Sequence, residues 1–116
     1  MAVTTDAFMS IGHDHFVCQD YVVAKDAIVA LSDGCSTAKD SDWGSRLLAR
    51  GLINERQNTM IDLAMVWATL LTAGRQADLL GLDLECLRAT LLFAEAMEDH
   101  FRVLVAGDGF VVARRK

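Results

Sequence analysis

The sequence predicts an α+β fold with antiparallel strands, in one domain that spans residues 1–116. Segments of like kind are grouped along the chain, with three predicted strands first, then two helices, then three further strands. This order lacks the regular strand–helix–strand repeat of a parallel sheet, so antiparallel pairing is favoured. Apolar residues make up 53% of the 116 positions, which is enough to bury a sizeable core.

The first three strands are predicted over 7–17, 21–24 and 27–31. Residues 7–17 alternate loosely between polar and apolar side chains, whereas the other two segments are short runs rich in apolar and β-branched residues. Lys25-Asp26 separates these two runs as a two-residue turn, so we expect them to form a hairpin.

The first helix is predicted to start at Ser41 or Asp42, either of which can cap its amino end, and to run to about Gln57. Apolar residues at helical spacing mark the side expected to face the core. These residues are Trp43, Leu47, Leu48 and Leu52.

The second helix is predicted to start near Thr59 and Asp62, which resemble a capping box, and to end near Leu80 with Gly81 as the residue after it. Both tryptophans of the chain are expected to pack in the core, because each lies on an apolar stripe. The stripe of the second helix contains Leu63, Val66, Trp67, Leu70 and Leu71.

The last three strands are predicted over 89–96, 101–106 and 110–114. A turn at 97–100 joins the first two, and Asp108-Gly109 forms a tight turn before the last.

Composition and charge favour a protein of the cytoplasm that binds neither nucleic acid nor a membrane. The net charge of −5 argues against nucleic acid, since phosphate backbones are bound by clustered Lys and Arg. The longest apolar run, 63–74, is too short to span a bilayer, and no signal peptide opens the chain. Cys18, Cys35 and Cys86 are widely spaced without a zinc pattern, and are expected to be reduced and mostly buried thiols.

Asp33-Gly34 directly follows the apolar run 27–31 and is the strongest candidate for a binding site. A carboxylate and a bare backbone carbonyl at one strand end are suited to Mg²⁺ or Mn²⁺. The hairpin brings Asp20, at the start of the preceding strand, close to Asp33. An ordinary Asp-Gly turn after a strand is the alternative interpretation.

Other motifs support weaker hypotheses. Gly107-Asp108-Gly109 invites a dinucleotide-binding interpretation, but a β-prone segment follows it, so a hairpin turn is favoured. His13 and His15 could ligate a transition metal if they shared a strand face, although solvated histidines are the simpler interpretation. Cys35 is not expected to be a nucleophile, because the charge of Asp33 would raise the pKa of its thiol.

Four segments in this order resemble the first half of metal-dependent protein phosphatases of type 2C, most closely their divergent bacterial branch. The segments are Gln19-Asp20-Tyr21, Ala30 to Ser36, Ala89-Thr90-Leu91-Leu92, and Val105-Ala106-Gly107-Asp108-Gly109. The resemblance implies part of an α/β-β-α sandwich, with antiparallel β-sheets flanked by helices. It also implies two Mg²⁺ or Mn²⁺ ions and a metal-activated water that attacks phosphoserine or phosphothreonine in protein substrates.

The resemblance assigns the central roles to three residues. Asp33 resembles the aspartate that bridges both metals, and Gly34 resembles the glycine that lends its carbonyl to one of them. Asp20 resembles the acidic residue that supports the site through metal-bound water, so Asp33 and Asp20 are the expected catalytic residues.

Three further residues correspond to family positions, but in each case this sequence has a different residue at that position or beside it. Gln19 stands where many members have a glutamate ligand, and is a weaker, neutral candidate for the metal. His15 falls where many members have a phosphate-binding arginine, a role that requires protonation. Asp108 resembles the aspartate of the family's Gly-Asp-Ser hairpin, which supports the site structurally, but Gly109 replaces the serine here.

The family's second half brings a further Asp-Gly and an Asp-Asn that complete the metal cluster, and neither motif follows here. We therefore expect the chain to be the N-terminal half of a phosphatase domain. Such a half would expose strand edges and is expected to form homo-oligomers through them, unless a separate polypeptide completes it. The alternative function is a catalytically inactive, phosphatase-like module that binds another protein.

Overall fold

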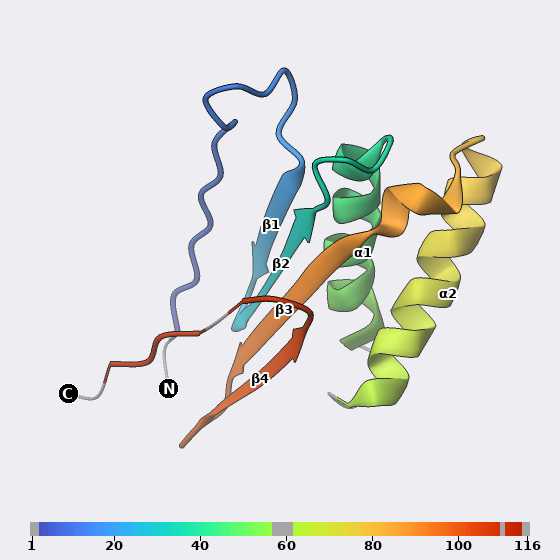
Figure 1. Ribbon diagram of the computed structural model, residues 1–116. Coiled ribbons are helices and arrows are strands. Elements are labelled where there is room, and N and C mark those ends of the chain that lie inside the picture. The colour runs from blue at the N-terminus through green and yellow to red at the C-terminus, as the bar shows by residue number, and fades with distance from the viewer. Residues whose placement is uncertain (1–2, 57–61, 110, 115–116) are drawn as a thin grey trace.

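The computed structural model describes residues 3–56, 62–109 and 111–114, and in these residues the chain forms one antiparallel sheet with helices on one face (Figure 1). The sheet has four strands in the order β1-β2-β3-β4, which is also their order along the chain. The elements are β1 (Asp20–Lys25), β2 (Ile28–Gly34), α1 (Ser41–Arg56), α2 (Leu63–Leu79), the 3₁₀ helix η1 (Leu84–Leu87), β3 (Ala89–Ala96) and β4 (Phe101–Ala106).

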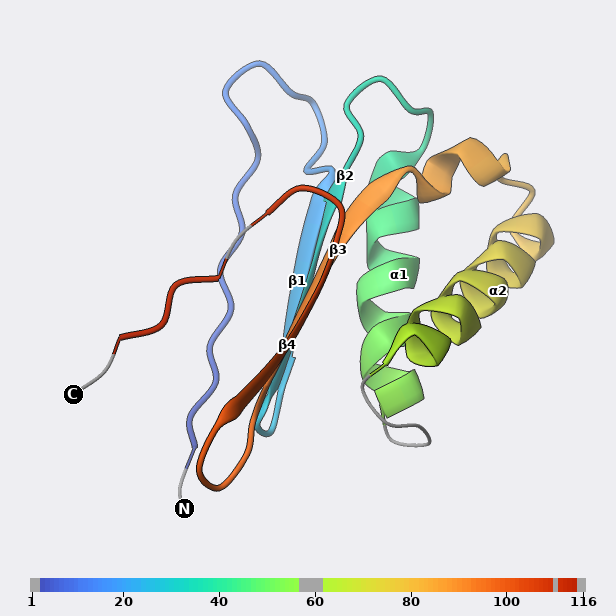
Figure 2. The same cartoon turned by 60° about the horizontal axis from the view of Figure 1, so that its bottom comes forward.

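The core lies between the sheet and α1, with α2 as an outer layer. Ala30 of β2 and Phe93 of β3 are paired across the sheet and are buried against Leu48 and Leu52 of α1. Strand residues alternate between the two faces, so Asp33, an odd-numbered residue of β2, lies on the face away from the helices. Figure 2 shows both helices on one side of the sheet, and the described residues before β1 and after β4 on the other.

The four central strands and both helices confirm the predicted α+β fold. The β1–β2 turn has two residues, as expected, but Lys25 pairs with Ile28, so the turn is Asp26-Ala27, one residue later than the predicted Lys25-Asp26. Asp26 has a φ of 54°. Gly81 follows α2 at a φ of 72°, and the Leu82 amide donates to the Ala77 carbonyl at 2.9 Å, as in a glycine-terminated helix. Asp62 caps the start of α2 by accepting from the Met65 amide, while Thr59 lies outside the described residues.

The two outermost predicted strands are wrong. Residues 7–17 form an irregular segment with a turn in which the His15 amide donates to the Gly12 carbonyl at 3.1 Å. Residues 111–114 are also irregular, and residue 110 is not described. In both segments the apolar pattern was local, whereas a strand needs a neighbouring edge to take up its backbone hydrogen bonds.

Both tryptophans are exposed, so the prediction that they pack in the core is wrong. Trp43 is 47% exposed and Trp67 is 60% exposed. The buried side of α2 instead carries one large residue, Met65, and four smaller ones. The two helices approach closely there, since a Cβ at Gly51 of α1 would lie only 3.2 Å from the Thr69 side chain. This stripe consists of Met65, Val66, Thr69, Ala73 and Ala77. Four large apolar residues of α2 are left on its outer side: Leu63, Trp67, Leu71 and Leu79.

The edges of the sheet are β1 and β4. These are the strands through which oligomerisation was predicted, and that oligomerisation stays a prediction.

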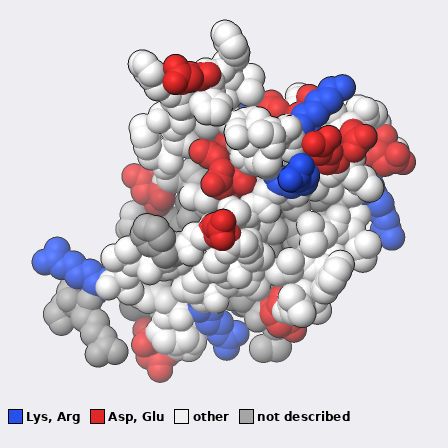
Figure 3. Space-filling view, viewed as in Figure 1, with Lys and Arg blue, Asp and Glu red and all other residues white. Residues whose placement is uncertain are grey.

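None of the described helices is long and apolar enough to cross a membrane. On the face seen in Figure 3, acidic and basic side chains are scattered, with uncharged surface between them.

Candidate functional site

A pocket of about 720 Å³ lies at the end of the sheet where β1 begins and β2 ends. It brings together most of the residues that the sequence marked as candidates: His15, Gln19, Asp20, Asp33 and Gly34 all line it. Asp108 does not line it, and lies beyond the end of β4 as an exposed residue.

The backbone at Gly34 shapes the floor of the pocket. Its amide donates to the Gln19 carbonyl at 3.2 Å, which fastens the end of β2 to the residue before β1. A Cβ at this position would lie 2.5 Å from that carbonyl oxygen and 2.9 Å from the Ser41 carbonyl oxygen. Only glycine therefore lets the chain pass between the start of β1 and the start of α1.

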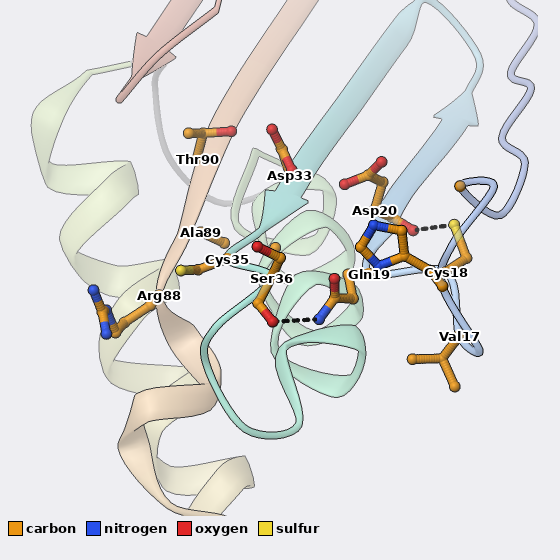
Figure 4. A pocket seen from close by; sticks show the side chains of 13 residues that line it. Val17, Cys18, Gln19, Asp20, Asp33, Cys35, Ser36, Arg88, Ala89 and Thr90 are labelled. Carbon is orange, nitrogen blue, oxygen red and sulfur yellow. Dashed lines mark hydrogen bonds between the residues drawn. The ribbon is translucent and has the colours of Figure 1, made fainter.

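The Gln19 side chain fixes the loop that leads from β2 to α1. Its amide nitrogen donates to the Ser41 hydroxyl at 3.1 Å and approaches the Ser36 carbonyl at 3.4 Å (Figure 4). The observed contacts of Gln19 are thus with protein groups, and its part in metal binding stays a prediction.

Asp20 and Asp33 form the electrostatic centre of the site. They are directly paired across β1 and β2, and their carboxylates occupy the same region of the pocket in Figure 4. Partial burial raises the pKa of the Asp20 carboxyl, and Asp33 raises it further through a hydrogen bond and its like charge. Two carboxylates held this close repel each other when both are ionised, so a bound cation would relieve the repulsion.

Thr90 is a pocket residue to which the sequence analysis gave no role. It is paired with Asp33 across β2 and β3, and Figure 4 shows its hydroxyl directed toward Asp33. The hydroxyl oxygen is buried and has no hydrogen-bond partner, an arrangement that is costly unless a ligand or water completes it. The register of β2 on β3 was the signal that could have identified it.

The oxygen donors at this end of the sheet fit a hard divalent cation as part of its ligand set. Two carboxylates, the carbonyl of Gly34 and the unpaired Thr90 hydroxyl are all oxygen groups of the kind that Mg²⁺ and Mn²⁺ prefer. In the described part of the chain, no group of three or more His, Cys, Asp or Glu residues is placed to hold a metal. The two aspartates alone are fewer charged ligands than a hard divalent cation usually takes.

The basic side chains near the pocket are less well placed to neutralise the two carboxylates. The charge of His15 opposes the dominant effect of burial by lowering the pKa of Asp20. His13 and His15 do not share a strand face, because residues 7–17 form no strand. Arg88 lines the pocket, but its guanidinium points away from the carboxylates in Figure 4 and lies 3.6 Å from Glu85.

The expected direction of the Cys35 pKa is wrong. The Thr37 hydroxyl lies 3.3 Å from the Cys35 sulfur, and hydrogen bonds from the side chain and backbone of Thr37 lower the pKa of this thiol. Burial raises the pKa of the Cys86 thiol, and the charges of Asp40 and Asp83 raise it further. All three cysteines are free, and only Cys86 is fully buried.

These opposite shifts predict selective alkylation of Cys35. A lower pKa gives more thiolate at neutral pH, so iodoacetamide should modify Cys35 at least about 10-fold faster than Cys86, as followed by peptide mass spectrometry. Thr37→Val removes the hydroxyl at nearly constant shape and should slow the reaction at Cys35 alone. Equal rates at Cys35 in the two proteins would contradict this account of its pKa.

Comparison with known proteins identifies one related family. A family model described as Protein phosphatase 2C matches residues 10–116, which include every residue of the pocket. Neither a curated protein nor a solved structure matches the chain.

Proposed function

Because the chain belongs to the protein phosphatase 2C family, we propose that its pocket is part of a metal-dependent site that hydrolyses phosphoserine and phosphothreonine in proteins. The observation that carries this proposal is the meeting of Asp20 and Asp33 at paired strand ends. Their position in the pocket agrees with the roles that the family motifs imply for them.

Each residue has a distinct part in the proposed site. Asp33 and the Gly34 carbonyl would hold Mg²⁺ or Mn²⁺ directly, and Asp20 would hold it through water. When bound, these ions lower the pKa of water and neutralise charge on the phosphoryl group. His15, which lines the pocket, would attract the substrate phosphate when protonated. The Thr90 hydroxyl would donate a hydrogen bond to an oxygen in the pocket, which completes its own pairing.

A second candidate function is a phosphatase-like module that binds a partner without catalysis. The absence of a third acidic ligand among the described residues favours it, since tight binding of a hard divalent cation requires several charged oxygen ligands. The two candidates differ in whether this chain turns over a phosphorylated substrate.

Phosphate release from a phosphothreonine peptide tests the proposed activity. We expect the purified chain to release phosphate with Mn²⁺ and to lose this activity when EDTA is added, because the cation supplies the charge neutralisation. A phosphotyrosine peptide of the same sequence serves as the control for substrate class, and should be hydrolysed more slowly. Folded protein that releases no phosphate at any Mn²⁺ concentration would contradict the enzymatic proposal and favour the binding module.

A further inference from the structure

Five residues spaced by four form an exposed ridge along the outer side of α2. Four of them are large and apolar, and the fifth is a basic residue whose side chain makes no ion pair with any described residue. The α2 ridge consists of Leu63 (70% exposed), Trp67 (60%), Leu71 (61%), Arg75 and Leu79 (86%). Because α2 packs on the rest of the chain through its opposite side, the ridge has no role in the fold of a single copy.

A groove of about 490 Å³ runs beside the α2 ridge, between α2 and η1. Gly74 leaves space in its floor: a Cβ there would meet nothing closer than the Leu84 side chain at 3.7 Å. The rim holds Arg75 and Asp78, and the remaining walls are mostly leucine. Such a groove suits a large aromatic side chain that carries one hydrogen-bond donor.

Trp67 is a large aromatic residue with one hydrogen-bond donor, the kind of side chain that this groove suits. The Arg75 guanidinium can lie against an indole face in a cation–π contact, and the Asp78 carboxylate can accept from the indole N–H. Trp67 does not line the groove of its own chain. Arg75 and Asp78 lie two or more turns further along α2, so one chain does not place its own Trp67 between them. A second copy related by a two-fold axis satisfies both sites at once.

We propose that the α2 ridge is a homodimer interface, with the two-fold axis passing at Leu71 and the Trp67 of each copy seated in the groove of the other. Leu71 lies four residues from both Trp67 and Arg75, so a two-fold axis at Leu71 places Trp67 of one copy against Arg75 of the other. The i, i+4 ridges of two such helices pack at a crossing angle of about −50°. Leu63 and Leu79 then flank the contact at its two ends.

This surface differs from the sheet edges, and the proposal does not depend on phosphatase activity. The α2 helix has 17 residues and so extends for about 25 Å. Two helices that cross at about −50° touch mainly near their crossing point, so we expect the interface to be smaller than the standard area of about 800 Å² per partner. We therefore expect a dimer that dissociates on dilution.

Sedimentation velocity of the full chain, over a range of concentrations from about 1 to 200 μM, tests the interface. The unmodified chain should shift from monomer to dimer, and Trp67→Ala should raise the dissociation constant at least about 10-fold, because the interface loses its central aromatic anchor. Trp43→Ala is the matched control, since it removes the other exposed tryptophan, on α1, and should leave the dimer unchanged.

Disulfide cross-linking provides a second, geometric measurement. Leu71→Cys places two thiols at the two-fold axis and should give a covalent dimer under mild oxidation, whereas Gln76→Cys, also exposed on α2, should not. A chain that stays monomeric at every concentration would overturn the proposal. So would a dimer that survives Trp67→Ala, or one that is lost with Phe101→Asp on the open face of the sheet but not with Trp67→Ala.

Discussion

Asp33→Asn is expected to abolish Mn²⁺ binding and to lower any Mn²⁺-dependent phosphate release at least about 100-fold, since changes even in residues behind a metal ligand cost 10–100-fold. The substitution keeps the side-chain shape and removes the charge proposed to hold the cation. Because Asp33 contributes to the raised pKa of Asp20, the variant loses a like-charge repulsion, and its thermal midpoint should be unchanged or higher. Titration calorimetry with Mn²⁺ and thermal unfolding measure the two effects.

Asp26→Asn is the matched control for this prediction. Asp26 is an exposed aspartate in the turn at the other end of the same hairpin, with a φ of 54° that asparagine also tolerates. This variant should bind Mn²⁺ as the unmodified chain does. If Asp33→Asn retained full Mn²⁺ affinity, or if both variants lost it equally, the assignment of the cation to the Asp20–Asp33 pair would be wrong.

Gly44→Ala is expected to destabilise the protein by about 3 kcal/mol, although alanine is the better helix former. A Cβ at position 44 would lie 1.6 Å from the Cys86 carbonyl oxygen, because α1 and η1 meet backbone to backbone there. Neither backbone can move without shifting its whole helix. For a domain of this size the thermal midpoint should fall by roughly 10 °C, and chemical denaturation should give the same loss of unfolding free energy.

Gly74→Ala, at a second helical glycine, is expected to have the opposite effect on stability. Its Cβ would make an ordinary contact at 3.7 Å with the Leu84 side chain, so the gain in helix propensity should stabilise the protein by about 0.5–1 kcal/mol. Both measurements should be made at low protein concentration, so that self-association does not contribute. A similar loss of stability in the two variants would show that packing at Gly44 is not the cause.

The sequence predicted the central strands and both helices because their signals are local. β1 and β2 are β-branched runs around a two-residue turn, and α2 is bounded by Asp62 and Gly81, which the structure confirms as its cap and its terminating glycine. The same hairpin predicted that Asp20 and Asp33 lie close together, but not that they are directly paired, because a turn at Lys25-Asp26 would place Asp20 opposite Leu31. The observed turn at Asp26-Ala27 pairs the two aspartates.

The predictions that were wrong, and the residue that was missed, depend on contacts between segments far apart in the sequence. Trp67 and Leu71 carry larger apolar side chains than Ala73, yet Ala73 is buried and both larger residues are exposed. The role of Thr90 required the pairing of β2 with β3, which no local signal specifies. Size and hydrophobicity predict that a residue prefers burial, but not which face of a helix finds a partner.

The order of the strands has a consequence for how the pocket comes together. β1 joins β2, and β3 joins β4, through short turns, whereas β2 and β3 are connected only through both helices and η1. Closing that long connection carries the largest loop entropy in the sheet. Asp20 and Asp33 belong to the β1–β2 hairpin, whereas Thr90 belongs to the β3–β4 hairpin. The pocket is therefore complete only when the two hairpins have docked, and it persists only as long as the helices between them hold that docking in place.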